Sequence, residues 1–577
     1  MRGHYVIATT LLALLSAQCT VLPQRQRVPI VYLDQGWTAH ERQSYYRTPQ
    51  GMELLGMRYQ WLLALERPVG SQRFAAPDHL AQFGFLIDDD PVGNPDQLPV
   101  GFTKHRDPNT GDDMLDLSCA TCHSGQINYG GQGIRIDGGA GMHDMNQFLQ
   151  ALVVAQLTTY ILPWKFDHFA QKVLGVRYPD GKCELRHAFG SVLHTFLSEG
   201  FTQWYHGQSL TQDGFGRTDA LGRISNALFA DRLQVPANYG RADAPVSIPH
   251  LWDIWLLDWA QWNGSIHQPM LRNAGTALGL DAPLALVNAN GEVLPEAERY
   301  QSTVEVAALH CIETTLAKLQ TPRWPENVLG TIDRPQAAHG KELYDQFCAS
   351  CHDPRVAEYH TGWYPPHSAA PTTTLPEWQV ALFPVDQIGT DPRAADNFAK
   401  RTVDLSKLDP SDPSLRHISA ADGLRYITSR VISRQYDEIG LTAAQRKEFD
   451  GLGRPDEVRA PRMYRAAPLD GIWATPPYLH NGSVPNLYQL LLPAAQRDAT
   501  FFAGNFAYDP KHVGYESTRF RGGFRFRTSD VGNANSGHEY GTDMSDADRW
   551  ALLEFLKISG EDRPLPSPPE PPQCGPR

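Results

Sequence analysis

The clearest hydrophobic pattern in this chain of 577 residues lies close to its C-terminus. Between Trp550 and Leu556, apolar residues recur every three or four positions and form one continuous apolar side. Ser545 stands just ahead of them, and its spacing from Asp548 resembles a capping box in which Asp replaces Glu. The pattern predicts an amphipathic final helix that packs against another element.

Four tryptophans form a second pattern in the middle of the chain. Trp252, Trp255, Trp259 and Trp262 are separated by steps of three, four and three residues. On a helix, these steps would place all four indoles on one face. The pattern predicts a helix whose aromatic stripe is buried in the core, because amphipathic periodicity usually reflects packing.

The N-terminus has the order of residues that is typical of a secretory signal. Arg2 precedes the apolar stretch Val6–Leu15, which is too short to span a bilayer well and is followed by small residues. We therefore expect residues 1–18 to be a cleaved signal peptide, and the mature protein to be periplasmic or secreted in a bacterium. Cys19 leaves a lipid anchor as a minor alternative, although Gln18 stands where a lipobox prefers Gly or Ala.

Prolines and glycines divide the rest of the chain. Three prolines and a glycine between residues 321 and 336 interrupt any helix there, which predicts a domain boundary. We expect an N-terminal domain over residues 27–320, a C-terminal domain over residues 336–560 and a disordered Pro-rich tail over residues 561–577. Helices joined by long irregular loops, with few short strands, are expected because the chain holds 48 glycines and 44 prolines.

The composition limits the class of partner. A formal charge of −13 argues against nucleic acid. After the N-terminal stretch, no apolar run approaches the length that spans a membrane, so we expect the protein not to be membrane-spanning. The acidic balance is compatible with docking of a basic electron-donor protein.

The strongest chemical signal is a pentapeptide that occurs twice, at Cys119–His123 (the first motif) and Cys348–His352 (the second motif). Cys-x-x-Cys-His is the attachment sequence of c-type haem. Its cysteines form thioethers to one porphyrin, and its histidine is the proximal iron ligand. A shared zinc site is disfavoured because more than two hundred residues separate the two pairs of cysteines. We therefore predict two covalently bound haem c groups, held by Cys119, Cys122, His123, Cys348, Cys351 and His352.

With these motifs in place, the chain resembles dihaem c-type cytochromes of the bacterial dihaem cytochrome c peroxidase and MauG superfamily. Its pattern is most similar to that of the dihaem rubber oxygenases. The likeness runs from about Gln35 to Lys557. It rests on the segments Leu98–Phe102, Ser118–Ile127, Ile136–Gly139, Asp243–Ser247, Gln261–Gly264, Gly471–Pro485 and Gly537–Gly541.

The resemblance implies a mainly α fold with two cytochrome c-like haem domains. In cytochrome c folds, the helix ahead of the haem motif crosses the C-terminal helix. We expect the helical stretch that leads into the second motif to make this crossing. Its contacts would join Gly340, Leu343 and Tyr344 to Trp550 and Leu553.

The resemblance also implies distal ligands. For the second haem, the rubber-oxygenase pattern supplies a distal histidine, which is His538 here. Met463 is the competing candidate, because the peroxidases of this superfamily use methionine at the corresponding haem. An iron with two histidine ligands is suited to passing electrons, which leaves the first haem as the catalytic candidate with an open or exchangeable position opposite His123.

Other side chains around the first haem are less well defined. His143 follows a Gly-rich segment and could reach the iron, although a lone histidine is more often an ordinary core or surface residue. Trp252 and Trp262 have a second interpretation, as haem-lining or inter-haem walls that assist electron transfer. The carboxamide and carboxylate of a peroxidase distal site cannot be placed by motif.

The leading functional hypothesis is an exported haem-dependent oxidoreductase that activates peroxide at the N-terminal haem, with electrons relayed by the C-terminal haem. One alternative is a dioxygenase that cleaves an apolar alkene or a polyisoprene-type substrate. A second is a non-catalytic electron-transfer cytochrome. The expected partners are peroxide or dioxygen and a small donor cytochrome or cupredoxin.

Two further features are expected. Calcium between the domains is a cofactor that the resemblance allows, as in the related peroxidases. Export permits disulfides, and a bond between Cys183 and Cys311 is the pairing we expect among the remaining cysteines.

Overall fold

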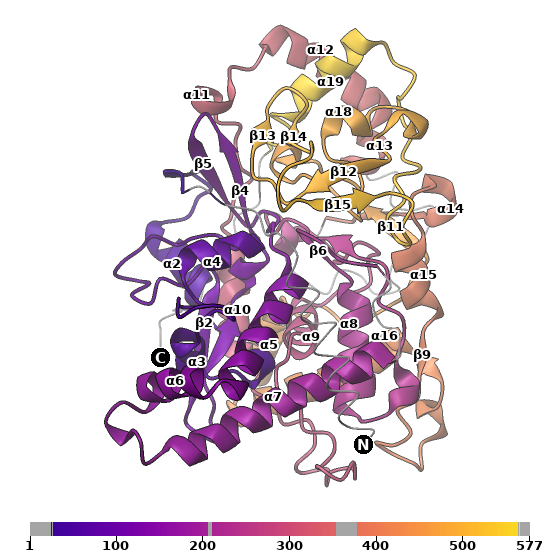
Figure 1. The fold of residues 1–577 in the computed structure, drawn as a ribbon. Helices are drawn as coiled ribbons and strands as arrows, with labels where there is room; N and C mark the ends of the chain where they lie inside the picture. The colour runs from indigo at the N-terminus through magenta and orange to yellow at the C-terminus, as the bar shows by residue number, and fades with distance from the viewer. Residues whose placement is uncertain (1–24, 26, 206–210, 354–377, 564, 566–577) are drawn as a thin grey trace.

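The computed structural model describes residues 25, 27–205, 211–353, 378–563 and 565. Helices dominate these residues and the strands are short, which agrees with the expected mainly α class (Figure 1). The predicted signal peptide at 1–18, Cys19 and most of the predicted tail at 561–577 lie outside the described residues.

The α-helices are α2 (Ala39–Arg47), α3 (Tyr59–Ala64), α4 (Pro77–Leu80), α5 (Met145–Ile161), α6 (Pro163–Leu174), α7 (Lys182–Tyr205), α8 (Ala220–Asn226), α9 (Pro269–Gly279), α10 (Val306–Leu316), α11 (Glu326–Leu329), α12 (Arg334–Phe347), α13 (Ala349–His352), α14 (Val385–Ile388), α15 (Arg393–Lys400), α16 (Ala420–Glu438), α17 (Ala443–Phe449), α18 (Leu487–Leu490) and α19 (Asp546–Leu556). The strands are β1 (Ile30–Tyr32), β2 (Phe102–Arg106), β3 (Asp113–Leu117), β4 (Ser124–Tyr129), β5 (Gln132–Asp137), β6 (Arg217–Thr218), β7 (Val246–Ser247), β8 (Ala381–Pro384), β9 (Thr402–Val403), β10 (Ile418–Ser419), β11 (Met463–Ala466), β12 (Thr500–Ala503), β13 (Tyr508–Asp509), β14 (Gly514–Tyr515) and β15 (Phe524–Arg527).

The β-structure consists of small sheets. The largest one in the described part of the chain has the order β1-β5-β4, in which β1 is parallel and β4 antiparallel to β5. The remaining sheets there have two strands each. The antiparallel pair β2–β3 pairs Phe102 with Leu117, and the first motif follows directly, between β3 and β4.

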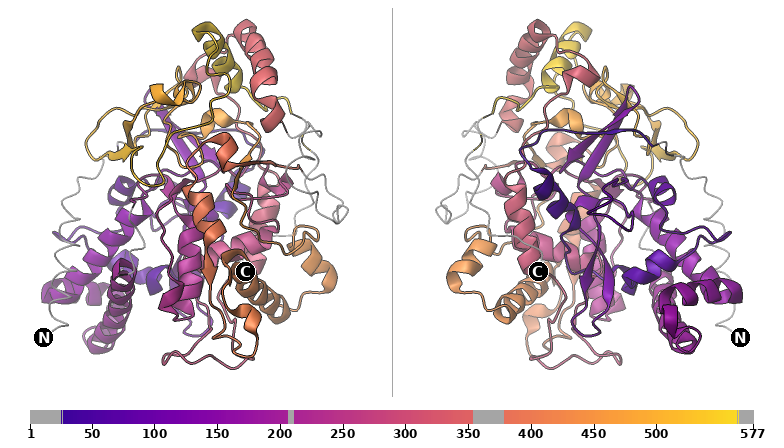
Figure 2. Two further views of the ribbon diagram at one scale, coloured as in Figure 1. Left: turned by 90° about the vertical axis from the view of Figure 1, so that its right-hand side faces the viewer. Right: turned by 90° about the vertical axis from the view of Figure 1, so that its left-hand side faces the viewer.

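The predicted crossing of α12 and α19 is present, and the two helices lie side by side at one end of the molecule (Figures 1 and 2). Ser545 caps α19, as predicted, by accepting the backbone N–H of Asp548 at 3.1 Å. The ring centroids of Tyr344 and Phe555 are 5.1 Å apart at the contact. Trp550 stacks on Tyr488 of α18, with ring centroids 4.6 Å apart.

The two halves of the sequence share one apolar core. Buried residues from Trp37 to Leu556 belong to a single cluster. Helix α16, from the predicted C-terminal domain, packs on α9 and α10 from the predicted N-terminal domain. Gln435 of α16 also donates a hydrogen bond to the carbonyl of Ser302 at 2.7 Å. The domain boundary at 321–336 stays a prediction, and the structure adds that α16 folds back across it.

The predicted tryptophan helix is wrong. Residues 252–262 contain only one 3-10 turn, Ile254–Leu256, and are otherwise irregular. Asp253 and Gln261 have left-handed φ values of 65° and 66°, which a right-handed helix excludes. Trp252, Trp255 and Trp259 are nevertheless buried, so the core assignment holds for them, whereas Trp262 is half-buried.

The expected disulfide between Cys183 and Cys311 is also wrong. Cys183 has a free thiol and is exposed near the start of α7. Cys311 lies on α10 and is bonded to another cysteine. Because the Cys183 side chain is exposed on the outside of α7, its thiol does not reach Cys311 on α10. Among the described residues, no helix has the length and apolar content that a membrane crossing requires.

The α12–α19 contact predicts a strong effect of one methyl group. A Cβ added at Gly340 would lie 1.9 Å from the carbonyl oxygen of Ala551, so Gly340→Ala must push the helices apart. We expect a loss of about 3 kcal/mol in the free energy of unfolding, measured by thermal or denaturant unfolding. The control is Gly200→Ala in α7, where a Cβ meets no atom within 4 Å and the variant should be neutral or slightly more stable. Equal stability of both variants would contradict the close crossing.

Candidate haem sites

The first motif forms a tight turn after β3. Ser118 caps this turn by accepting a backbone N–H at 3.2 Å. Behind the turn, Gly101 has a left-handed φ of 84°, and a Cβ added there would lie 2.3 Å from the backbone nitrogen of Thr121. Glycine is therefore required at this position for the segment that carries Cys119 and Cys122 to pack against β2.

His123 is held in an orientation suited to metal binding. Its Nδ1 lies 2.8 Å from the carbonyl oxygen of Pro249, and its own carbonyl accepts a hydrogen bond from the Tyr45 hydroxyl at 3.0 Å. A carbonyl can only accept, so Nδ1 carries the proton and Nε2 keeps a lone pair. Burial lowers the pKa of His123 to about 4, which keeps the ring neutral. These are the features of a metal-ligating histidine supported by a second hydrogen bond.

His352 in the second motif has the same support. It ends α13, and its Nδ1 lies 2.6 Å from the carbonyl oxygen of Ala467. Burial again lowers the pKa of this histidine below its usual value. Each motif histidine therefore presents Nε2 as a free lone pair, although the two rings lie in unrelated stretches of backbone.

The structure brings His538 to His352. Their ring centroids are 6.2 Å apart, with an interplanar angle of 58°. Two imidazoles that bind one metal have centroids roughly 6 Å apart, because each metal–nitrogen bond is about 2 Å long. Nδ1 of His538 is buried and has no hydrogen-bond partner among the described residues. Burial lowers the pKa of His538 to about 3, so it is also a neutral imidazole. The donor set fits an iron between the two histidines.

Backbone geometry fixes His538 in this position. Its N–H donates to the carbonyl of Ile388 at 2.9 Å, and its φ is 51°. The preceding Gly537 lies against Gly389, so that an added Cβ would be 2.3 Å from the carbonyl carbon. Met463, the other candidate, lies on β11 opposite Pro384. Ligation by His538 stays a prediction, and its ring geometry supports it.

His143 lies beside the first motif, at a cysteine. Its Nε2 is 3.8 Å from Sγ of Cys122, and its ring stacks on Phe85 with centroids 5.3 Å apart. None of the ring contacts among the described residues joins His143 to His123. Burial lowers the pKa of His143 to about 4. His143 therefore belongs to an apolar wall, whose other rings are Phe74, Phe83, Phe85, Phe102 and Phe148.

A polar cluster near the first motif was missed by the sequence reasoning. Arg272 of α9 forms an ion pair with Glu313 of α10, and Asn273 Nδ2 donates to the same carboxylate at 2.7 Å. The charge of Arg272 lowers the pKa of His123 and of Cys119. Glu313 raises the pKa of the Cys119 thiol. A polar trio in two otherwise apolar helices is the signal that could have identified these residues.

The two segments that hold the motif histidines are tied together by an indole. Trp252 Nε1 donates to the carbonyl of Asp470 at 2.8 Å. Trp252 follows Pro249 by three residues, and Asp470 follows Ala467 by three residues. His250 stacks on Trp252 with ring centroids 4.4 Å apart. One hydrogen bond thus links the segment whose carbonyl holds His352 to the segment whose carbonyl holds His123.

Trp262 makes a parallel connection. Its Nε1 donates to the carbonyl of Ser247 at 2.8 Å, and its own carbonyl accepts the N–H of Arg465 at 2.9 Å. Both tryptophans chosen from the sequence therefore lie at the contact between residues 247–262 and 465–470. Their part in electron transfer stays a prediction.

Beside Trp252, two carboxyl groups are buried together. Asp253 is 3% exposed and Asp470 is 1% exposed. Arg563 pairs with Asp470 at 2.8 Å, and the Thr321 hydroxyl lies 3.5 Å from Asp253. Burial and the charge of Asp470 raise the pKa of Asp253 to about 8. Asp253 is therefore a neutral acid at pH 7.

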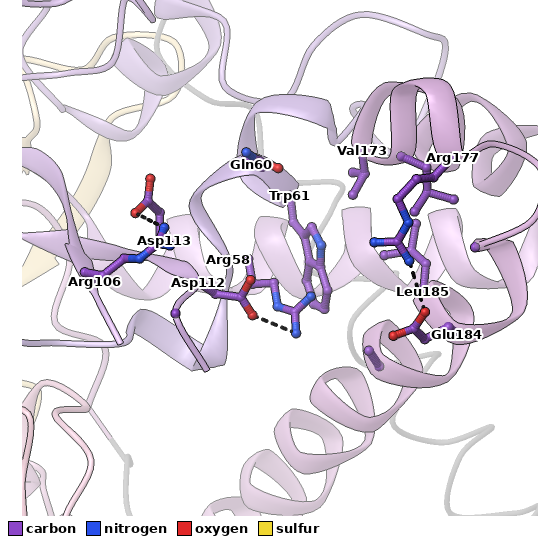
Figure 3. Close-up of a pocket in the computed structure, with 14 residues that line it drawn as sticks. Arg58, Gln60, Trp61, Arg106, Asp112, Asp113, Val173, Arg177, Glu184 and Leu185 are labelled. Carbon is purple, nitrogen blue, oxygen red and sulfur yellow. Dashed lines mark hydrogen bonds and ion pairs between the residues drawn. The ribbon is translucent and has the colours of Figure 1, made fainter. Parts of the chain in front are cut away.

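A polar cavity of about 260 Å³ lies elsewhere, between α3, α6, α7 and the β2–β3 pair (Figure 3). Its arginines are paired: Arg58 with Asp112 at 2.9 Å, Arg106 with Asp113 at 3.2 Å and Arg177 with Glu184 at 3.2 Å. It contains no motif residue. The described residues hold no group of three or more His, Cys, Asp or Glu that could bind a metal ion, and calcium between the domains stays a prediction.

Comparison with known proteins defines the class. Residues 463–502 match the family model "RoxA-like, cytochrome c-like". This segment includes Ala467 and Asp470, which hold the second motif histidine and the Trp252 indole. The match indicates a cytochrome c-like protein of the haem oxidoreductase type, which implies covalently bound haem c.

A long relative then places the chain in a family. The chain is 35% identical over 578 residues to the uncharacterized protein y4iJ of Sinorhizobium fredii (strain NBRC 101917 / NGR234). The match covers 93% of this chain and 94% of that protein. The uncharacterized protein y4iM of the same organism is 56% identical over 52 residues, 9% of this chain and 12% of that protein. The chain belongs to the same family as y4iJ.

The buried acid predicts a pH effect on stability. The unfolded chain releases the Asp253 proton near pH 4, whereas the folded chain keeps it to about pH 8. Folding stability therefore falls as pH rises through this window, by up to about 1.4 kcal/mol per unit. Asp253→Asn lacks this loss, so its melting temperature should rise relative to wild type between pH 5 and pH 8. The exposed Asp89→Asn variant is the control, and a difference that stays constant with pH would contradict the buried neutral acid.

Proposed function

We propose that the chain is an exported dihaem c-type cytochrome oxidoreductase, with one haem at each motif. The carrying observation is the asymmetry between the two motif histidines. His352 faces His538 at the spacing of two imidazoles on one metal. His143, the histidine beside the first motif, lies against Cys122 and Phe85 instead. His352 and His538 would hold a haem at the second motif from both sides, whereas His123 would hold one at the first motif from one side and leave room there for a small molecule.

Haem at these sites supplies an iron that changes oxidation state and, at the first motif, binds the oxidant. The protein orients His123 through Pro249 and His352 through Ala467. The phenylalanine cluster beside His143 excludes water from one side of the first site. A haem held by His352 would supply stored electrons, and the hydrogen-bonded Ala467–Asp470 and Pro249–Trp252 segments would lie between it and a haem held by His123.

Peroxide is the oxidant that this arrangement favours. Reduction of hydrogen peroxide to two waters consumes two electrons and two protons, and O–O cleavage is helped by a polar group that protonates the departing oxygen. Glu313, held by Arg272 and Asn273, is a half-buried carboxylate close enough to Cys119 to change its pKa. It is our candidate for the group that takes a proton from hydrogen peroxide and returns it to the departing oxygen. A small cytochrome or cupredoxin would supply the electrons.

Dioxygen is the alternative oxidant, used to cleave an apolar alkene or a polyisoprene-type substrate. The RoxA-like match and the apolar wall around His143 favour it. The wall consists of rings that contact one another with centroids 4.9 to 5.9 Å apart around Phe85 and Phe148, as a dry site requires.

Ligand binding tests the asymmetry. The reduced protein should bind about one carbon monoxide for every two haems, because His538 blocks the second iron. His538→Ala should bind about two, with the second haem changed from low-spin to high-spin by absorption and electron paramagnetic resonance. His512→Ala, at a surface histidine paired with Asp509, is the control and should behave as wild type. A wild type that binds no carbon monoxide would be an electron-transfer cytochrome.

Turnover distinguishes the two oxidants. We expect the holoprotein to oxidise a reduced donor cytochrome with hydrogen peroxide, and Glu313→Gln to lower this rate by about a hundredfold with unchanged haem content. Asn288→Ala, at an exposed turn, is the control. Oxygen uptake with a polyisoprene emulsion, without peroxide turnover, would contradict the peroxidase proposal and favour the dioxygenase alternative.

A further inference from the structure

Arg465 of β11 is a buried cation that forms no ion pair with a described residue. It is 7% exposed, and its Nε and Nη1 have no hydrogen-bond partner among the described residues. Two other buried arginines donate to backbone carbonyls: Arg217 to those of Asp213 and Asn481, and Arg454 to those of Leu257 and Trp255. Arg135 also leaves its Nε and Nη1 without a partner among the described residues, but its Nη2 donates to the carbonyl of Ile87 and to Gln126. No carboxylate of the described residues forms an ion pair with Arg465. A buried guanidinium is unfavourable unless it is paired with an anion.

The guanidinium lies beside Trp262, at the contact between residues 247–262 and 465–470. It stands 5.7 Å from the ring centroid of Trp262. Along the chain, Arg465 precedes by two residues the carbonyl of Ala467 that holds the second motif histidine. Its charge acts on His250, which follows the carbonyl that holds His123. Arg465 therefore reaches from β11 toward the first motif.

A second cation at the first motif makes the imbalance larger. The charges of Arg272 and Arg465 act on each other. Glu313 pairs with Arg272 and not with Arg465. Asp258 is the acid whose charge acts on Arg465, but its carboxylate accepts the backbone N–H groups of Val380 and Trp259, both at 2.9 Å. No carboxylate of the described residues therefore pairs with Arg465, and its Nε and Nη1 are left to bind another anion.

Haem c brings such anions, because it carries two propionate carboxylates on the edge away from its thioether bonds. We propose that Arg465 binds a propionate of the haem at the first motif, an inference that rests on the proposed dihaem function. A guanidinium donates two parallel N–H groups to a carboxylate, and Nε and Nη1 are such a pair. The positive charge at this haem edge favours the reduced iron, so Arg465 raises the reduction potential of the first haem and draws electrons toward it.

The test compares the reduction potentials of the holoprotein and its variants at one pH. In Arg465→Met, the haem that binds carbon monoxide should have a lower midpoint potential, and its propionate bending band in resonance Raman spectra should shift. Arg465→Lys keeps the charge and should restore most of the potential but not the band. Arg459→Met is the matched control, since Nε of Arg459 already donates to the carbonyl of Gly264 at 2.8 Å, and it should leave both values unchanged.

The outcomes separate this inference from the function on which it rests. A wild type with fewer than two haems per chain would overturn the proposed function. Two haems with unchanged potential and Raman band in Arg465→Met would overturn only the propionate contact. A shift confined to the haem that does not bind carbon monoxide would overturn the assignment to the first haem. A wild-type potential that follows the added chloride or phosphate would show that a solvent anion is the partner.

Discussion

Two backbone carbonyls determine the arrangement on which the rest of this structure depends. Pro249 accepts from Nδ1 of His123, and Ala467 accepts from Nδ1 of His352. Each hydrogen bond fixes the tautomer and points Nε2 away from the protein backbone. Trp252 joins the two supports, because its indole donates to the carbonyl of Asp470. The two supports therefore belong to one short, hydrogen-bonded stretch of structure.

Polar groups that are costly to bury gather around this link. Asp253 and Asp470 lie beside Trp252, Arg465 lies beside Trp262, and Glu313 lies on α10 near the first motif. Burial raises the pKa of Asp253 and lowers that of Arg465, and shifted groups of this kind cluster at functional sites. Most of the buried apolar residues form one large cluster around these groups, and two small clusters lie apart from it. This contrast supports a site between the motifs, whereas no motif residue lines the surface cavity at Arg58 and Asp112.

The sequence predicted the features that depend on neighbouring residues. The two motifs, the Ser545 cap and the helices α12 and α19 follow from local spacing, and the structure contains both helices. The tryptophan helix failed because left-handed residues at Asp253 and Gln261 cannot be recognised from hydrophobic periodicity. His538 was selected through resemblance alone, because its proximity to His352 arises only when the chain folds. Glu313 and Arg465 were missed because what identifies them is their buried surroundings, which no spacing rule contains.

The most direct measurement is the intact mass of the exported, mature chain, produced in a host that assembles c-type cytochromes, followed by peptide mapping. Haem c is covalent, so it survives denaturation. The account predicts two haem additions per chain, one on the peptide with Cys119 and Cys122 and one on the peptide with Cys348 and Cys351. A chain that carries no haem, or carries haem at one motif only, would contradict the prediction of a haem site at each motif.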